Sequence, residues 1–321
     1  MSVVVILVVA ALLVALALWS VLVRDAFLAV AGYVCYGLLL SLLWVRLHGI
    51  DVALTEAAIG GGLTGALLIA AVARLRGTEA ATWSERSGAG VRAFAMLLSV
   101  AVTAALVLCV LVLPDPAPTL AAQVMQNLPA TGVGNPITGV LLAFRAVDTL
   151  LEAIVLVIAL IGVWSMAPDR FWGGRPGLHY TSDPDGILAY LARLLPPIGI
   201  VIGVYLFWAG ADHPGGKFQA ATILAAMWML VQMAGLADAP PVGNRWLRVG
   251  IVAGPLIFIA VGVLGLLTAG ALFAYPPDWA KPMIVVIEVA LLPTLVLVLA
   301  LLMNGAPARG AEVASSGSAP R

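Results

Sequence analysis

A 21-residue stretch of this sequence reads MIVVIEVALLPTLVLVLALLM, over positions 283–303, and contains one charged side chain, Glu288. An α-helix needs about 20 apolar residues to cross roughly 30 Å of hydrocarbon, because it rises about 1.5 Å per residue. The stretch is therefore long and apolar enough to span a bilayer. No opposite charge lies close to Glu288 in the sequence, so its partner must come from another helix or another chain.

The sequence contains further apolar runs of the same kind. There are nine in all, at 3–23, 26–45, 51–73, 92–113, 137–165, 187–209, 218–237, 247–272 and 283–303. None shows the alternation of a membrane β-barrel. The first run has no basic residue before it and no small-x-small cleavage site after it, so we expect a retained helix. The pattern predicts an all-α, polytopic membrane helix bundle with about nine spanning helices.

Composition supports a membrane protein and excludes several classes. Of the 321 residues, 63% are hydrophobic and 10% are charged, whereas a soluble globular protein is about half apolar and about a quarter charged. The mean hydropathy is +1.10. A water-soluble enzyme is excluded. The formal net charge is zero, so there is no basic field to bind nucleic acid, and we expect no nucleic-acid partner.

Basic residues between the runs predict the orientation. If the N-terminus is outside, the inner segments hold eleven basic residues: Arg24, Arg74, Arg76, Arg86, Arg92, Arg170, Arg175, Arg245, Arg248, Arg309 and Arg321. The outer segments hold three, Arg46, Lys217 and Lys281. We therefore expect an N-out, C-in topology in the inner (plasma) membrane.

The fifth run carries three charged residues. Arg145, Asp148 and Glu152 stand at i, i+3 and i+7, which places them within an arc of about 60° on one face of a regular helix. One cation can offset one of the two carboxylates, so the other can take up and release a proton. A charge-neutralised packing contact with a neighbouring helix or subunit is the alternative. As one straight helix the run would exceed about 40 Å, so it tilts or its start lies along the surface.

Two more acids lie in the third run. Glu56 is about 9 Å deep if the helix starts at Ile50, which favours a role in proton or ion relay. Asp51 lies near the outer boundary and fits an ordinary acid at a helix end. Gly60-Gly61-Gly62 follow, and allow either close helix packing or a local π-bulge. For Glu288 the relay and structural interpretations stay equally open.

A polar turn, DHPGGKFQ at positions 212–219, separates the sixth and seventh runs. His213 can titrate near neutrality, and Lys217 can meet an acid or a lipid headgroup. Taken alone, a tight Pro-Gly turn that begins the seventh helix is the simpler interpretation.

Three stretches resemble parts of the Mrp-type multisubunit cation/proton antiporters and the related membrane arms of membrane-bound hydrogenases and complex I. Residues 51–73 resemble the D-like module of the hydrogenases, FRAVDTLLE at 144–152 resembles their E-like module, and the turn at 213–219 resembles the signature of the antiporter B-like module. The resemblance implies three modules, at 1–90, 91–180 and 181–304, with three, two and four helices. The tail at 305–321 is rich in Gly, Ala, Ser and Pro, which predicts disorder.

The resemblance also implies roles for residues. It places Glu56, Asp148 and Glu152, with Arg145, on a polar route for protons or sodium, and raises the structural importance of His213 and Gln219. Two features depart from the family pattern: Lys217 stands where the family usually has another glycine, and the modules are joined in one polypeptide. The sequence shows no long antiporter-like core with a mid-helix lysine, so the main pumping subunits must be other proteins.

We therefore predict a membrane subunit of an Mrp-type Na+/H+ antiporter or a complex I-like assembly. The residues predicted for ion translocation are Glu56, Arg145, Asp148, Glu152 and Glu288, with Asp51, His213, Lys217 and Gln219 in structural or secondary roles. No haem, flavin or metal ligands are evident, so we expect a transporter subunit without a cofactor and not an enzyme. The expected partners are other antiporter-like or complex I-like membrane subunits, the lipid bilayer and protons, with sodium as a second cargo.

Two other functions remain open at this point. A scaffold would join antiporter-like subunits to a redox or carbon-uptake module without itself conducting ions. A self-sufficient transporter of a small solute would be active alone and would usually contain two related halves, which the sequence does not show.

Overall fold

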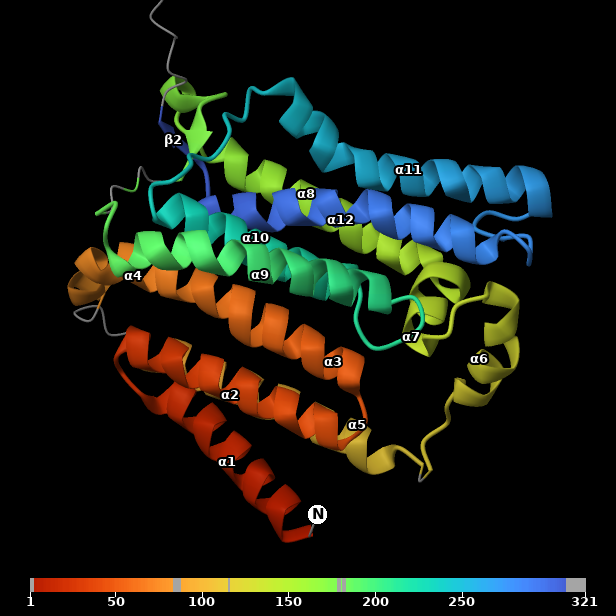
Figure 1. The fold of residues 1–321 in the computed structure, drawn as a ribbon. Coiled ribbons are helices and arrows are strands. Elements are labelled where there is room, and N and C mark those ends of the chain that lie inside the picture. The colour runs from red at the N-terminus through yellow and green to blue at the C-terminus, as the bar shows by residue number, and fades with distance from the viewer. Residues whose placement is uncertain (1–2, 83–87, 115, 178–179, 181–182, 310–321) are drawn as a thin grey trace, which may run out of the picture.

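The computed structural model describes residues 3–82, 88–114, 116–177, 180 and 183–309. They form a bundle of long helices packed side by side (Figure 1). The first half contains α1 (Val3–Leu22), α2 (Ala26–Arg46), α3 (Ile50–Thr55), the π-helix η1 (Glu56–Thr64), α4 (Gly65–Thr82), α5 (Ala89–Val112), α6 (Ala121–Asn127), the 3-10 helix η2 (Leu128–Thr131), α7 (Pro136–Gly139) and the π-helix η3 (Val140–Phe144). The second half contains α8 (Ala146–Ser165), the 3-10 helix η4 (Asp169–Phe171), β1 (Arg175–Pro176), α9 (Ile187–Ala209), α10 (Lys217–Met233), α11 (Arg245–Ala269), α12 (Ala280–Asn304) and β2 (Pro307–Arg309).

The predicted class, an all-α polytopic membrane protein, is confirmed. Within the described residues, eight helical segments are long and apolar enough to cross a membrane. The run at 218–237, expected as another span, is the helix α10, which has 17 residues and ends at Met233. It is shorter than the eight and packs against both α9 and α12.

Helix α12 lies at the centre of the bundle. It packs against α8, α10 and α11, and Figure 1 shows it between these neighbours. Its side chains Ile284, Ile287 and Leu291 are fully buried. Val286 and Val289 on the same helix remain exposed, so a helix that is apolar on all faces here meets other helices on most of its surface and the surroundings on the rest. The stretch that most clearly predicted a membrane span therefore forms the core.

The crossing of α11 and α12 depends on a small residue. Thr294 of α12 donates a hydrogen bond from Oγ1 to the Gly250 carbonyl at 2.7 Å and accepts one from the Gly254 N–H at 3.1 Å. A Cβ added at Gly254 would lie 3.0 Å from the Ala290 carbonyl oxygen and 3.1 Å from the Leu291 Cα. The two backbones can approach this closely because glycine has no side chain.

The N-terminal helices pack in the same way. A Cβ added at Gly37 of α2 would lie 3.1 Å from the Cα of Gly61 in η1. The glycine run at 60–62 thus combines close packing with a π-helix, the two possibilities that the sequence left open. Helix α10 contacts both α3 and η1, so it joins the N-terminal helices to the C-terminal ones.

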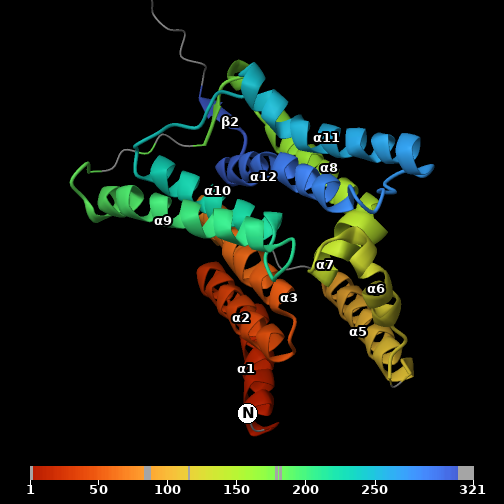
Figure 2. The same cartoon turned by 45° about the vertical axis from the view of Figure 1, so that its right-hand side comes forward.

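Helix α5 stands apart from the rest. None of its residues is buried, and Figure 2 shows it well separated from α2 and α3. Its whole apolar surface therefore faces the surroundings of the chain.

Two expectations need correction. The single helix expected over 137–165 is broken into α7, η3 and α8, and Arg145 lies between the last two with φ −133° and ψ 41°, outside helical geometry. The tail expected to be disordered from position 305 begins with an ordered strand, because β2 pairs with β1 in antiparallel orientation. The rest of the tail, residues 310–321, lies outside the described residues.

Replacing Gly254 with alanine should separate α11 from α12. The added methyl group meets backbone atoms that cannot rotate away, so we expect a loss of about 1–3 kcal/mol in stability, typical of overpacking. The thermal unfolding midpoint of the purified chain in detergent measures the effect. Gly162→Ala on α8 is the matched control, because a Cβ there meets nothing within 4 Å. Equal midpoints for the two variants would contradict this account of the crossing.

Candidate functional site

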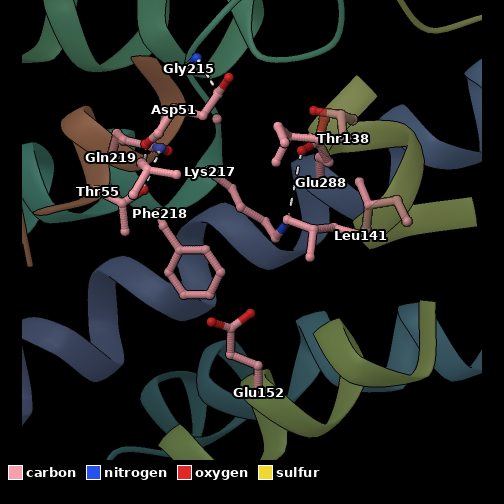
Figure 3. A pocket seen from close by; sticks show the side chains of 14 residues that line it. Asp51, Thr55, Thr138, Leu141, Glu152, Gly215, Lys217, Phe218, Gln219 and Glu288 are labelled. Atoms are coloured by element: carbon pink, nitrogen blue, oxygen red, sulfur yellow. Dashed lines mark hydrogen bonds and ion pairs between the residues drawn. The ribbon is translucent and has the colours of Figure 1, made fainter. Parts of the chain in front are cut away.

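A cavity of about 250 Å³ lies where α3, α8, α10, α12 and the α7–η3 segment meet. Four ionisable side chains line it, Asp51, Glu152, Lys217 and Glu288. Figure 3 shows them converging on the cavity from four different helices. In the predicted topology α3, α8, α10 and α12 all begin on the outer side, and that topology would place the cavity in the outer part of the bilayer.

A buried ion pair forms one wall of the cavity. The Lys217 Nζ, at the start of α10, lies 3.8 Å from the Glu288 Oε1 on α12, and each side chain is 5% exposed. The Lys217 Nζ also lies 5.5 Å from the centroid of the Phe218 ring. Glu288 therefore has its opposite charge on another helix of the same chain. Lys217, which the sequence placed in an outer loop segment, is inside the bundle.

Asp51 connects three segments that are distant in the sequence. Its Oδ1 accepts a hydrogen bond from the Gly215 N–H at 3.0 Å and another from the Asn135 side-chain amide at 3.3 Å. The same Asn135 amide donates to the His213 carbonyl oxygen at 3.0 Å. Asp51 is in the first turn of α3, as an acid at a helix end should be, and it also fixes the turn between α9 and α10.

That turn requires glycine. Gly215 and Gly216 have φ angles of +145° and +149°, which side chains other than hydrogen rarely allow. A Cβ added at Gly215 would lie 2.5 Å from the Leu206 carbonyl oxygen. The His-Pro-Gly-Gly turn therefore places Lys217 at the first position of α10, facing inward.

Further polar contacts secure the same region. The Gln219 side-chain amide donates to the Thr55 hydroxyl at 2.9 Å, and the Thr138 hydroxyl donates to the Gly210 carbonyl at 2.6 Å. Gln219 is buried, whereas the His213 side chain is exposed. His213 thus contributes its backbone carbonyl to the site, while Gln219 contributes its side chain.

The three charged residues of the fifth run divide between two places. Because Arg145 lies outside α8, it does not share a helix face with the other two as the spacing had predicted. Its Nε lies 2.6 Å from the Asp148 Oδ2, and these side chains are 70% and 47% exposed. Glu152, one turn further along α8, points into the cavity toward Lys217 and Phe218 (Figure 3).

Glu56 lies elsewhere. It begins η1 and is half-buried, and a Cβ added at Gly37 of α2 would lie 3.3 Å from its Oε1. It is not among the residues that line the cavity. The structure therefore brings Asp51, Glu152 and Glu288 together and leaves Glu56 at the interface with α2.

The sequence reasoning missed Asn135 and Thr138. Both are buried and both bond to the turn between α9 and α10. Asn135 also caps α7 by accepting a hydrogen bond from the Ile137 N–H at 2.9 Å. An asparagine directly before Pro136 is a recognisable helix start, but its long-range partners leave no trace in the local sequence.

An exposed ion pair joins Asp212, in the turn after α9, to Lys281, at the start of α12. The Lys281 Nζ donates to both oxygens of Asp212 at 2.8 Å, and the Gly134 N–H donates to Asp212 Oδ1 at 3.0 Å. The hydrogen bond from Lys281 lowers the pKa of Asp212 below its ordinary value of 3.8, and the bond from Gly134 adds to this, while partial desolvation opposes both. Asp212 thus ties the turn to the start of α12.

Removing the Asp51 carboxylate should loosen the turn. Asp51→Ala leaves the Gly215 N–H without its acceptor and removes one of the two acceptors of the Asn135 amide, so we expect a loss of about 1–3 kcal/mol in stability. Asp51→Asn keeps an acceptor oxygen and should lose less. Thermal unfolding of the purified variants measures the difference, and an alanine variant as stable as the asparagine variant would refute the role of Asp51.

The Asp212–Lys281 pair should make stability depend on acid pH. Because the pKa of Asp212 is lowered by folding, its stabilising contribution is complete above the unfolded value and disappears as the pH falls through the lower folded value. Asp212→Asn should flatten the decline in unfolding midpoint between about pH 5 and about pH 2. The effect should be small because the pair is exposed. Lys281→Met should have the same effect, and the double variant should add nothing further.

Two family models match separate segments of the chain. Residues 11–77 match the MbhD family model, which describes the D subunit of MBH. Residues 187–306 match the model described as a domain related to the MnhB subunit of Na+/H+ antiporter. Asp51 belongs to the first matched segment, and Lys217 and Glu288 belong to the second, so the cavity lies at their junction.

Two curated relatives match part of the chain. A protein of Rhizobium meliloti (strain 1021), described as a probable A/B subunit of a K(+)/H(+) antiporter, is 26% identical over 188 residues, which are 49% of this chain and 18% of that protein. An uncharacterised protein of Methanocaldococcus jannaschii is 24% identical over 153 residues, which are 43% of this chain and 58% of that protein. The chain thus spans less than two thirds of the length of either relative.

Two solved structures share the fold. A chain of the Mrp complex from Dietzia sp. DQ12-45-1b has a TM-score of 0.69 at 22% identity, covering 97% of this chain and 35% of that one. A chain of the membrane-bound sulfane sulfur reductase (MBS), an archaeal respiratory membrane complex, has a TM-score of 0.53 at 21% identity, covering 66% of this chain and 97% of that one. The chain therefore joins a segment that matches the MbhD model and a segment that matches the MnhB-related model in one polypeptide, and it shares the fold of a chain of an Mrp complex.

Proposed function

We propose that this chain is a subunit of a multisubunit Na+/H+ antiporter, or of a related complex I-like assembly, in the plasma membrane. In this proposal its acids help to move protons or sodium through the complex. The observation that carries the proposal is the cavity at the junction of the two matched segments, where Glu288 pairs with the buried Lys217 ammonium and Glu152 lines the same space. Residues 91–180, which lie between the matched segments and supply α8, serve as the E-like module.

The proposed mechanism is an exchange of charge between neighbouring acids. Two carboxylates that share one ammonium cannot both be neutralised by it, so one of them can bind and release a mobile cation. Glu152 exchanges with Lys217 and Glu288 across the cavity. Glu56 forms a second station at the α2 interface. Arg145 sets the resting state of α8 through its ion pair with Asp148.

An exposed ion pair supports the need for partner subunits. Arg145 and Asp148 are largely exposed in the single chain, yet they occur at the start of a helix that is apolar enough to span a bilayer. An ionised side chain in contact with hydrocarbon costs about 2.5–3.5 kcal/mol on insertion scales, depending on depth. A polar surface of another antiporter-like or complex I-like protein would remove that cost. The uncovered apolar surface of α5 is available to such a partner as well as to lipid.

The same ion pair favours a second candidate function, a scaffold. In that case the charges dock partner subunits, including a redox or carbon-uptake module, and do not conduct ions. The two functions differ in what mutations change, because a docking residue affects assembly and a conducting residue affects turnover.

Transport by the assembled complex distinguishes these functions. Glu152→Gln and Glu56→Gln should each remove most cation-dependent proton movement in proteoliposomes, measured with a pH-sensitive dye, while native gels show the complex intact. Asp278→Asn is the control, because Asp278 is an exposed acid between α11 and α12, and it should transport normally. Full transport by both glutamine variants would refute the mechanism, and loss of assembly with normal residual turnover would support the scaffold.

A further inference from the structure

The ammonium of Lys217 occupies an unusual place for a charged side chain. Lys217 is 4% exposed, and its Nζ faces a cavity whose other charged groups are all acids. The 3.8 Å separation from Glu288 Oε1 is longer than the about 2.7–2.9 Å of a direct charge-assisted hydrogen bond. The ammonium is therefore held near Glu288 by charge and not fixed by a short bond, and a water molecule can bridge the two.

Each charged residue that lines the cavity comes from a different helix. Asp51 on α3 already accepts two N–H donors. Glu288 on α12 forms the ion pair with Lys217 on α10, and Glu152 on α8 lines the same cavity. The α7–η3 segment and the glycine turn contribute uncharged residues to the lining. The cavity thus holds the carboxylates of Glu152 and Glu288 and a single monovalent cation, the Lys217 ammonium, that is covalently attached to the chain.

The Lys217 ammonium lies beside a carboxylate in the cavity, where an alkali cation could also bind. Na+ and K+ prefer oxygen ligands, and the lining includes the acids Glu152 and Glu288 and the hydroxyl residues Thr55 and Thr138. The cavity of about 250 Å³ has room for a partly hydrated ion. A second positive charge beside a buried ammonium is strongly repelled, because the surroundings screen poorly.

We propose that the Lys217 ammonium acts as a tethered cation that fills the alkali-cation site of this cavity, so that the cavity exchanges protons and excludes Na+ and K+. The proposal rests on the proposed function for its role in transport, and it names Lys217 as the residue that determines ion selectivity there. Removing the ammonium converts the cavity into a site for a mobile alkali cation held by Glu288 and Glu152.

Sodium binding to the purified full chain in lipid nanodiscs tests this proposal. Lys217→Met is the informative variant, because methionine is one atom shorter and leaves the place of Nζ vacant while keeping the apolar stem. Equilibrium binding of radioactive sodium, with N-methylglucamine maintaining the ionic strength, should be saturable in Lys217→Met, with about one ion per chain. Its unfolding midpoint should rise with sodium and then level off. Lys217→Arg, which keeps the charge, is the matched control and should bind no sodium.

The site of binding is identified by a second substitution. Adding Glu288→Gln to Lys217→Met should abolish saturable sodium binding, whereas adding Asp278→Asn should leave it unchanged. Sodium binding that survives the Glu288 change would overturn the proposal, as would a folded Lys217→Met variant that binds none.

The wild-type chain provides a test that does not depend on a variant folding. It should show no saturable sodium binding, and binding that Glu288→Gln removes would refute the exclusion of alkali cations. These experiments measure binding and not transport. If Lys217→Met binds sodium while Glu152→Gln transports normally, the proposal that Lys217 is a tethered cation is supported. The proposed transport role of the cavity is then refuted.

Discussion

The carboxylate of Asp51 is the contact on which the architecture of the site depends. It accepts hydrogen bonds from the Gly215 backbone and the Asn135 side chain, and so connects α3, the turn before α10 and the start of α7. Without Asp51 the Gly215 N–H would have no acceptor in a low-dielectric environment, and the Asn135 amide would keep only the His213 carbonyl. Because Gly215 is bonded to Asp51, the turn determines where α10 begins. Lys217 is the first residue of α10, and its side chain extends toward Glu288 on α12.

Two irregular helical segments adjoin charged residues, Glu56 and Arg145. Glu56 opens a π-helix, and a second π-helix ends at the non-helical Arg145. In hydrocarbon, backbone groups released from regular hydrogen bonding need other partners, and the Thr149 hydroxyl supplies one by donating to the Leu141 carbonyl at 2.6 Å. These breaks change the direction of side chains. Arg145 lies on the protein surface with Asp148, and Glu152 lines the cavity.

Length and apolarity predicted the helical class and most helix positions, because a bilayer imposes the same requirement on every span. The sequence also showed that Glu288 needed a partner from elsewhere. It could not identify Lys217 as that partner, since the register between α10 and α12 is set by packing and not by local pattern. The i, i+3, i+7 spacing wrongly placed Arg145 on one helix face with Asp148 and Glu152. That spacing assumes a continuous helix, and the helix is interrupted at Arg145, after η3. The family motifs at positions 51–56 and 213–219 marked the right segments without revealing that they touch.

The bond between Asp51 and Gly215 joins residues 164 positions apart, and these residues belong to two domains matched by separate family models. Two free proteins would have to meet in the membrane for such a bond to form, and its occupancy would then depend on their abundance. A single polypeptide makes the encounter intramolecular, with an effective concentration that expression level does not change. The cavity is therefore assembled in fixed one-to-one stoichiometry whenever the chain folds.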